Sequence, residues 1–445
     1  MKINFFNKNL FFINGILLAL LLVHSMYRDF QLERQFPMDL RNRVVGSRLQ
    51  KDGKLPYNYY WQPTDGIRYY DIRNLNKDDH GISNITASPF FNELLYPICD
   101  LPQRLISGIW LGLQYFFLFI MIALFYSLAN IKWKKWLIIN MGILFTATEA
   151  WKVLIQYGQL YFFEAFLMAF ILFMLIRNTK WTDIIAGILA ACFVLTRPIA
   201  IVMFIPFLFY FRKNTIFLAT AFAGLAVYGM FVLLNPHEQS LYKNYFSSLR
   251  KQVLIHIKDN PELIQVIDPN SLPFKNMEGF DLLEVEGYKK KYPIICFTEY
   301  GNVFVLYNKI TKTKMSLLML SAGLAITFLV VTGLFFYFSR KHPTQNIQVF
   351  LTGFLLYMIV ELFSPVHRPQ YNTVEWFPLV FAGILLLKEW RTAACLLLIL
   401  GLLLSISNAH RILMRHTLGE FVWLAALLLL AFQYLPDENK SITAS

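Results

Sequence analysis

Long apolar runs recur along nearly the whole chain, and they restrict the possible folds more than any other feature of the sequence. Hydrophobic residues make up 56% of the 445 residues, more than the charged surface of a soluble single-core domain would allow. Many of the runs are long enough for a helix to cross a hydrocarbon core of about 30 Å. The runs fall near 10–28, 104–129, 137–156, 159–176, 183–196, 199–211, 215–234, 315–338, 347–363, 374–388, 392–407 and 418–434.

This pattern predicts an all-α polytopic membrane protein with about 12 transmembrane helices, because helices satisfy their backbone polar groups within lipid. We expect the chain to form a single multi-pass domain over residues 1–445. The net charge of +13 comes mostly from cations at the ends of the apolar runs. Such cations follow the positive-inside rule, so they do not indicate a nucleic-acid partner.

The short basic connectors give the chain one consistent orientation. Placing the N-terminus in the cytoplasm puts five of them on the cytoplasmic side: 132–135, 177–180, 212–213, 340–341 and 388–391. Both termini are then cytoplasmic, and two large loops, about 29–103 and 235–314, face outward. We expect a multi-pass protein of a bacterial inner membrane, with its site on the outer face.

Two short outer turns carry cations that the positive-inside rule does not explain. "TRP" contains Arg197, and "SPVHRPQYN" contains His367 and Arg368. The runs before and after Arg197 are short for full spans, so their junction predicts a dent that opens outward. Two interpretations stay open for Arg197, a phosphate ligand or a snorkelling anchor. For His367 and Arg368 the alternative to a binding role is a polar hairpin turn.

The first outer loop contains a helical pattern that begins near Asp39 and ends at "DG". Its apolar residues fall on one side, which predicts an amphipathic helix lying on the membrane surface. Asp39 is either the N-cap of this helix or a general base held above the membrane. The cluster "YNYYW" contains Tyr57, which could stack on a sugar or serve as an interfacial aromatic residue.

Four stretches in this order resemble glycosyltransferase family 87, part of the GT-C superfamily of multi-pass enzymes. They are "MDLRNRVVGSRLQKDGKLPY", "YGQLYFFEAFLMAF", "LTRPIAIVMFIPFL" and "SPVHRPQY". The family's Gly-Gln-x-Asn step is matched by "GQLY", which has Tyr161 in place of Asn. Its late Ser-Pro…His motif is matched with a single histidine, His367, where members often show a pair.

The resemblance implies a GT-C-like fold and an outward-facing site that uses a polyprenyl-phosphate-linked sugar. In this family the sugar includes mannose, and the acceptor is an extracytoplasmic glycan or glycolipid. The resemblance makes Asp39 the base of an inverting transfer, and it makes Arg197, His367 and Arg368 the ligands of the donor phosphate. Gln159 and Tyr57 are further substrate-binding candidates. We expect no cofactor and no metal, since the first loop has no "DxD" pair.

Two other functions remain possible on the sequence alone. A transporter or flippase of lipid-linked glycans would place its ionisable residues near the middle of the bilayer and often shows internal repeats. A polymerase or ligase of surface polysaccharide would use the outer cations without a base in the first loop. The second outer loop predicts another amphipathic helix over 241–257, which could gate the entry of substrates.

Overall fold

The structure is a computed structural model in which all regular elements of the described residues are helices. The described residues are 8–34, 37–57, 59, 63–69, 85–210, 213–257, 301–311, 313, 315–366, 368–406 and 414–434. The expected all-α fold is therefore confirmed for this part of the chain. His367 lies outside the described residues.

The helices follow one another with short connections, and several of them are interrupted by 3-10 turns. In chain order they are α1 (Lys8–Glu33), α2 (Met38–Lys51), η1 (Pro63–Asp65), η2 (Ile67–Tyr69), α3 (Pro89–Leu94), α4 (Gln103–Leu128), α5 (Lys132–Phe145), α6 (Glu149–Tyr157), α7 (Tyr161–Arg177), α8 (Lys180–Thr196), η4 (Pro198–Phe204), α9 (Ile205–Phe209), α10 (Thr215–Leu234), α11 (Pro236–Ile257), α14 (Val303–Thr311), α15 (Leu317–Lys341), α16 (Asn346–Leu362), η5 (Gln370–Trp376), α17 (Phe377–Leu386), α18 (Ala393–Ile406) and α19 (Arg415–Ala431).

Four helices of the described chain are long and apolar enough to cross a membrane: α1, α4, α10 and α15. The pair α5 and α6 makes a fifth candidate if this helix pair, bent by 52°, is one span. Other apolar helices, such as α16 and α18, have only 10–17 residues. The protein is thus a membrane protein, but the expected count of about 12 spans is not confirmed, because several apolar runs form short or broken helices.

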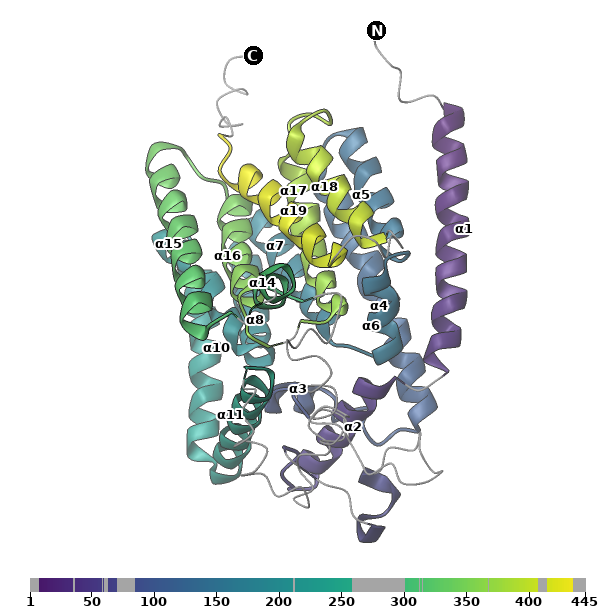
Figure 1. Cartoon of the computed structure of the whole chain (residues 1–445), viewed down its shortest axis with the longest axis vertical. Helices are drawn as coiled ribbons and strands as arrows, with labels where there is room; N and C mark the ends of the chain where they lie inside the picture. Colours follow the sequence, from purple (N-terminus) through teal and green to yellow (C-terminus); the bar gives the residue numbers. More distant parts are fainter. Residues whose placement is uncertain are drawn as a thin grey trace.

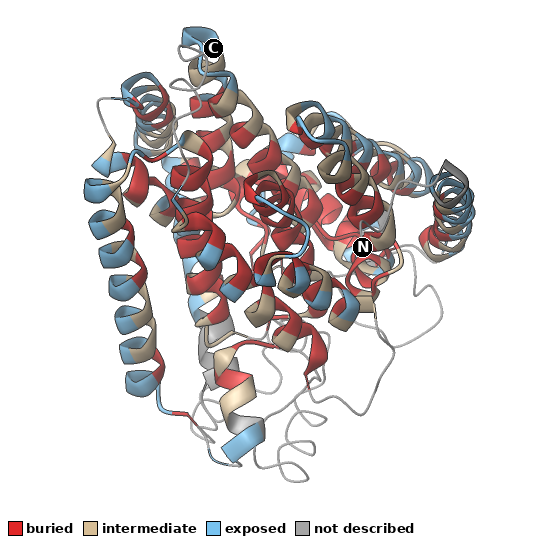
Figure 2. Ribbon diagram, turned by 90° about the horizontal axis from the view of Figure 1, so that it is seen from above, coloured by how far each residue is buried: buried red, intermediate tan, exposed pale blue. Residues whose placement is uncertain are grey.

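The two ends of the helical bundle differ in what they carry. Figure 1 shows the start of α1 and the end of α19 at one end of the bundle, while α2, α3 and α11 lie at the other. The loop helices therefore gather together, opposite the described chain ends. Figure 2 shows buried residues concentrated inside the bundle and exposed residues on its outer faces. Many of the exposed residues of α10 and α15 are large and apolar, as a lipid-facing surface requires.

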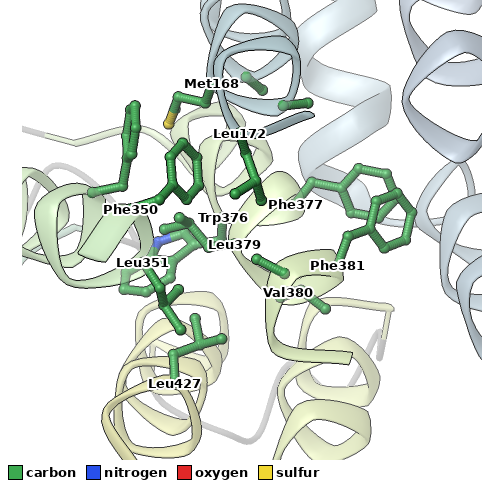
Figure 3. Close-up of a cluster of buried hydrophobic side chains, with 14 of the residues drawn as sticks. Met168, Leu172, Phe350, Leu351, Trp376, Phe377, Leu379, Val380, Phe381 and Leu427 are labelled. Atoms are coloured by element: carbon green, nitrogen blue, oxygen red, sulfur yellow. The ribbon is translucent and has the colours of Figure 1, made fainter. Parts of the chain in front are cut away.

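The core forms where α7, α16, η5, α17 and α19 meet. Its side chains are almost entirely aliphatic and aromatic, and Figure 3 shows Met168 and Leu172 from α7 facing Phe350 from α16 and Trp376 from η5. Such packing fixes the relative positions of the elements that converge on it. The turns that precede η5 and follow α8 are therefore held by this core.

A buried carboxylate fastens α1 to the bundle near the loop end. Asp29 accepts hydrogen bonds from Trp151 Nε1 at 2.6 Å and from Tyr115 Oη at 2.7 Å, and it also pairs with Arg28. Arg28 donates in turn to the backbone carbonyl of Thr146, between α5 and α6. A buried charge is tolerated when it is paired and hydrogen-bonded in this way. This attachment brings the chain into α2 beside the end of α6.

The helix α2 is buried by the protein, and this corrects the expectation of a surface helix. Val44 and Leu49 on its apolar side are fully buried, as the pattern predicts. However, Arg41 and Arg43 are only 4% and 7% exposed, so its polar side is covered as well. The helix ends as predicted, because Gly53 follows it with a φ of +73°.

Candidate active site

Asp39 lies in the first turn of α2, but it does not cap this helix. The N-cap is Pro37, and no side chain makes a capping hydrogen bond there. The carboxylate of Asp39 instead accepts a hydrogen bond from Nε2 of Gln159. The capping interpretation of Asp39 is therefore wrong, and its carboxylate faces a turn that follows 120 residues later in the chain.

Gly158 is what allows that turn to reach α2. It ends α6 with a φ of +66°, a conformation that glycine adopts without steric cost. A Cβ atom at this position would lie only 2.7 Å from Cβ of Pro37 and 2.6 Å from Cβ of Leu40. The turn is closed by the backbone N–H of Gln159, which donates to the carbonyl of Leu154 at 3.0 Å. Gly158 thus places Gln159 directly beside Asp39.

Arg43 completes the contacts around Asp39 by holding the amide of Gln159 in one orientation. One guanidinium nitrogen donates to Oε1 of Gln159 at 2.5 Å, and the other donates to the carbonyl of Gly158 at 3.1 Å. With its oxygen bound to Arg43, the amide presents its N–H group to Asp39. Burial raises the pKa of the Asp39 carboxyl, and the charges of Arg43 and Arg41 oppose this shift.

Arg197 lies at the break between α8 and η4 that the sequence predicts. Its Nη2 donates to Oε2 of Glu361, at the end of α16, over 2.8 Å. Its guanidinium also lies over the ring of Tyr161, 5.2 Å from the centroid. The Arg197 side chain remains 26% exposed, and among the described residues its other guanidinium nitrogens make no hydrogen bond. These nitrogens are available to an anion.

Three tyrosines connect the surroundings of Asp39 with those of Arg197. Tyr371, in η5, stacks on Tyr161 with 5.3 Å between ring centroids and an interplanar angle of 23°. Tyr157, at the end of α6, meets Tyr371 at 6.3 Å. Burial raises the pKa of the Tyr371 hydroxyl, and the neighbouring Tyr161 and Asp39 raise it further. Tyr157, which contacts Tyr371, comes two residues before Gln159, the hydrogen-bond partner of Asp39.

Arg368 has a different environment from the one that the sequence led us to expect. Its Nη1 binds both carboxylate oxygens of Glu420, and its Nη2 donates to the carbonyl of Asn372 at 3.1 Å. A second carboxylate, that of Glu375, lies 3.6 Å away. The Arg368 side chain is 3% exposed. Because two buried carboxylates already bind this cation, a donor-phosphate role for Arg368 does not fit the structure.

The other predicted site residues are distributed as follows. Gln159 lies beside Asp39, and its amide group binds both Asp39 and Arg43. Tyr57 is 3% exposed, and its hydroxyl donates to the carbonyl of Ala87 at 2.8 Å. It therefore serves to join the loop to α3, which does not fit the predicted contact with substrate. His367 lies outside the described residues, so its role as a phosphate ligand stays a prediction.

Three residues near the site were not singled out from the sequence. Arg43 is one of the charged residues of the predicted surface helix, Glu361 lies inside the apolar run 347–363, and Tyr371 belongs to the turn "SPVHRPQYN". The one usable signal was Glu361, since a single carboxylate in an apolar run marks a buried pair or a function. No group of three or more potential metal ligands occurs among the residues that the structure describes.

Comparison with known proteins decides the kind of enzyme. The model of glycosyltransferase family 87 matches residues 86–267, which include Gln159, Tyr161 and Arg197. Over this segment the chain is similar to glycosyltransferase family 87, which makes it a transferase enzyme. No curated protein and no solved structure matches it. Asp39 and Arg368 of this glycosyltransferase lie outside the matched segment, so their roles depend on the geometry described above.

Proposed function

We propose that the enzyme transfers a hexose from a polyprenyl-phosphate donor to a glycan or glycolipid acceptor on the extracytoplasmic side of a bacterial inner membrane. Mannose is the first sugar to test. We further propose that the reaction inverts the anomeric carbon, that Asp39 is the general base, and that no metal or other cofactor takes part. This proposal places both chain ends in the cytoplasm and the loop helices α2, α3 and α11 outside.

The observation that carries the proposal is the hydrogen bond between Asp39 and Gln159. It joins a carboxylate on the outer loop helix to a turn inside the segment that matches the family. Asp39 as a residue is partly exposed, and burial of its carboxyl group raises the pKa. A raised pKa makes a carboxylate a stronger base, while the bond from Gln159 keeps it oriented. A correctly placed base contributes about 10²–10⁴-fold to a rate.

The proposed step is a single displacement. Asp39 takes the proton of the acceptor hydroxyl as its oxygen forms a bond to the anomeric carbon of the donor. The bond from that carbon to the phosphate oxygen breaks, and its electron pair leaves with polyprenyl phosphate. Arg197 stabilises the negative charge that develops on this phosphate, using the nitrogens that Glu361 does not occupy. Glu361 keeps the guanidinium in place between α8 and α16.

The test measures sugar transfer by the purified protein after it has been reconstituted into membranes. The protein is incubated with a panel of polyprenyl-phosphate hexoses and candidate acceptors, and released polyprenyl phosphate and the glycosylated product are measured together. We expect one donor to be consumed in step with product formation, with NMR showing the anomeric configuration inverted. If the donor crosses the bilayer of proteoliposomes with its sugar still attached, and no product forms, the protein is a flippase and the proposal fails.

Asp39→Asn tests the role of the base separately. We expect transfer to fall by about 10²–10⁴-fold, because the amide cannot accept the proton. Donor binding should be retained, since Arg197 is untouched. The midpoint of thermal unfolding should stay the same or rise at neutral pH, because the raised pKa of Asp39 means that burial disfavours its charged form. Full transfer activity in this variant would remove Asp39 from the mechanism.

A further inference from the structure

Tyr157, Tyr161 and Tyr371 have a feature that packing alone does not require. They are neighbours, as the ring contacts show, yet each keeps an intermediate exposure to solvent. None of their hydroxyls makes a hydrogen bond to any other described residue. The buried tyrosines nearby behave differently, since Tyr115, Tyr57 and Tyr357 all use their hydroxyls within the protein. Tyrosine hydroxyls among core residues usually find such partners.

We propose that Tyr157, Tyr161 and Tyr371 form the wall that binds the pyranose ring of the donor sugar. The three residues offer what a polyhydroxylated ring needs: hydroxyls that donate and accept hydrogen bonds, carried on flat aromatic bodies. Binding sites for small polar molecules commonly combine such surfaces with a few convergent polar groups. We refer to this set of residues as the tyrosine wall.

The position of the tyrosine wall agrees with the geometry of the reaction. At one end, Tyr371 meets Tyr157 at 6.3 Å between ring centroids, and Tyr157 comes two residues before Gln159, which hydrogen-bonds to Asp39. At the other end, Tyr161 lies under the guanidinium of Arg197. An inverting displacement places the base and the leaving phosphate on opposite sides of the sugar. A ring held along the wall would therefore have the acceptor side at Asp39 and the phosphate side at Arg197. This inference rests on the proposed function.

Three different elements supply the wall, so its form depends on the fold as a whole. Tyr157 ends α6, Tyr161 begins α7 and Tyr371 lies in η5, and η5 packs against both of these helices. Tyr157 precedes Gly158 and Gln159 directly, while Tyr161 comes two residues after Gln159. The short turn that orients Asp39 therefore also positions two of the three tyrosines. One segment, residues 157–161, therefore positions both the donor sugar and the base.

The experiment compares Tyr157→Phe, Tyr161→Phe, Tyr371→Phe and Tyr371→Leu with the wild-type enzyme. Each protein is assayed with the preferred donor and with analogues that lack one ring hydroxyl at a time. Tyr126→Phe, an exposed tyrosine on α4, serves as the matched control. We expect a Phe variant to lose about 3–10-fold in kcat/KM with the full donor, the usual effect of one neutral hydrogen bond. The Phe variant should lose nothing further with the analogue that lacks the partner hydroxyl.

Removing the aromatic ring should affect donor binding in a way that removing the hydroxyl alone does not. Tyr371→Leu should weaken donor binding in an Asp39→Asn background, where it is measured without turnover, by more than Tyr371→Phe does. The inference is overturned if the wild-type enzyme transfers sugar while all Phe variants and Tyr371→Leu match Tyr126→Phe with every donor. That result would leave the proposed function intact. Absence of transfer by the wild-type enzyme would instead overturn the proposed function, and the inference with it.

Discussion

The chain contains two Arg-Pro steps at turns between apolar segments, and the structure gives them different environments. At Arg197-Pro198 the arginine has one carboxylate partner, Glu361, and is 26% exposed. At Arg368-Pro369 the arginine binds Glu420, lies near Glu375 and is 3% exposed. The same dipeptide thus places one cation where an anion can reach it and the other inside a neutralising cluster. The number of buried carboxylates around each guanidinium makes the difference.

This contrast supports the proposed binding role for the first turn and a structural role for the second. A buried arginine with two carboxylates is costly to remove, since its loss leaves uncompensated charges in the interior. A partly exposed arginine with one partner can exchange solvent for a phosphate at little cost to the fold. Substitutions should therefore affect stability at one turn and catalysis at the other.

The largest effect is expected from Arg368→Met. It leaves the carboxylates of Glu420 and Glu375 buried without their cation, which should lower the free energy of unfolding by about 3–5 kcal/mol. Thermal unfolding in detergent measures this loss. The double variant Arg368→Met, Glu420→Gln should recover part of the stability, because one orphaned charge is gone. If Arg368→Met unfolds like the wild type but no longer binds donor, the assignments of the two turns are reversed.

Arg197→Ala should chiefly affect the reaction. We expect kcat to fall by about 10²–10³-fold, the usual consequence of losing one group that stabilises transition-state charge. The unfolding midpoint should change less than in Arg368→Met, since the Arg197 side chain is partly exposed and only one carboxylate, the buried Glu361, loses its partner. Arg391→Ala, an exposed arginine on the connector between α17 and α18, is the control. A drop in stability without a drop in kcat would mean that Arg197 only anchors its helix.

A smaller effect is expected on the pH profile of the reaction. It distinguishes Asp39, with its neighbours Gln159 and Arg43, from the group of charges around Arg368. Because Asp39 must be ionised to act as a base, kcat/KM should fall as the pH falls through its pKa, which burial raises above the usual value. Arg43→Gln removes a charge that lowers this pKa, so the acid limb should move to higher pH, reducing activity severalfold within the limb. Arg43→Lys keeps the charge and should leave the limb near its wild-type position.

An unmoved acid limb in Arg43→Gln would show that Arg43 does not act on Asp39 through its charge. Glu420→Gln provides a comparison within the other turn. It should shift stability and leave the acid limb unchanged, since the hydrogen-bond partners of Glu420 in the described part of the chain are Arg368 and Thr373 and not Asp39.

The smallest effect is expected from chelation. If the free nitrogens of Arg197 are sufficient to stabilise the leaving phosphate, together with the predicted ligand His367, EDTA should leave the transfer rate unchanged. The rate is compared before and after dialysis against EDTA and after addition of Mg²⁺ or Mn²⁺. Loss of activity that a divalent ion restores would show that Arg197 works with a metal.

The sequence allowed several features of the fold to be predicted because their causes are local. The break at Arg197 followed from two short apolar runs and a proline, and the end of α2 followed from Asp52-Gly53. Both signals act within a few residues. The count of spans could not be predicted in the same way, because a run such as 137–156 forms the bent pair α5 and α6.

The site could be predicted only where a residue type was unusual for its position. Asp39 and Arg197 attracted attention because they were charged residues at outer helix ends. The partners of these residues depend on contacts that no local pattern encodes. Gln159 meets Asp39 across 120 residues of sequence, and Arg368 meets Glu420 across 52. For this reason Arg368 resembled Arg197 in the sequence, although the structure surrounds it with carboxylates.

The turn at Gly158 has a consequence for how the enzyme is assembled during synthesis. The loop that carries Asp39 is made before α6, so the carboxylate has no oriented amide beside it until Gly158 and Gln159 have been added and delivered to the same side of the membrane. Pro37 and Leu40 then fit against a residue without a side chain. If Asp39 is the base, as we propose, its carboxylate has no oriented partner while α4 and α5 are made, and the site is complete only when two segments synthesised at different times have met.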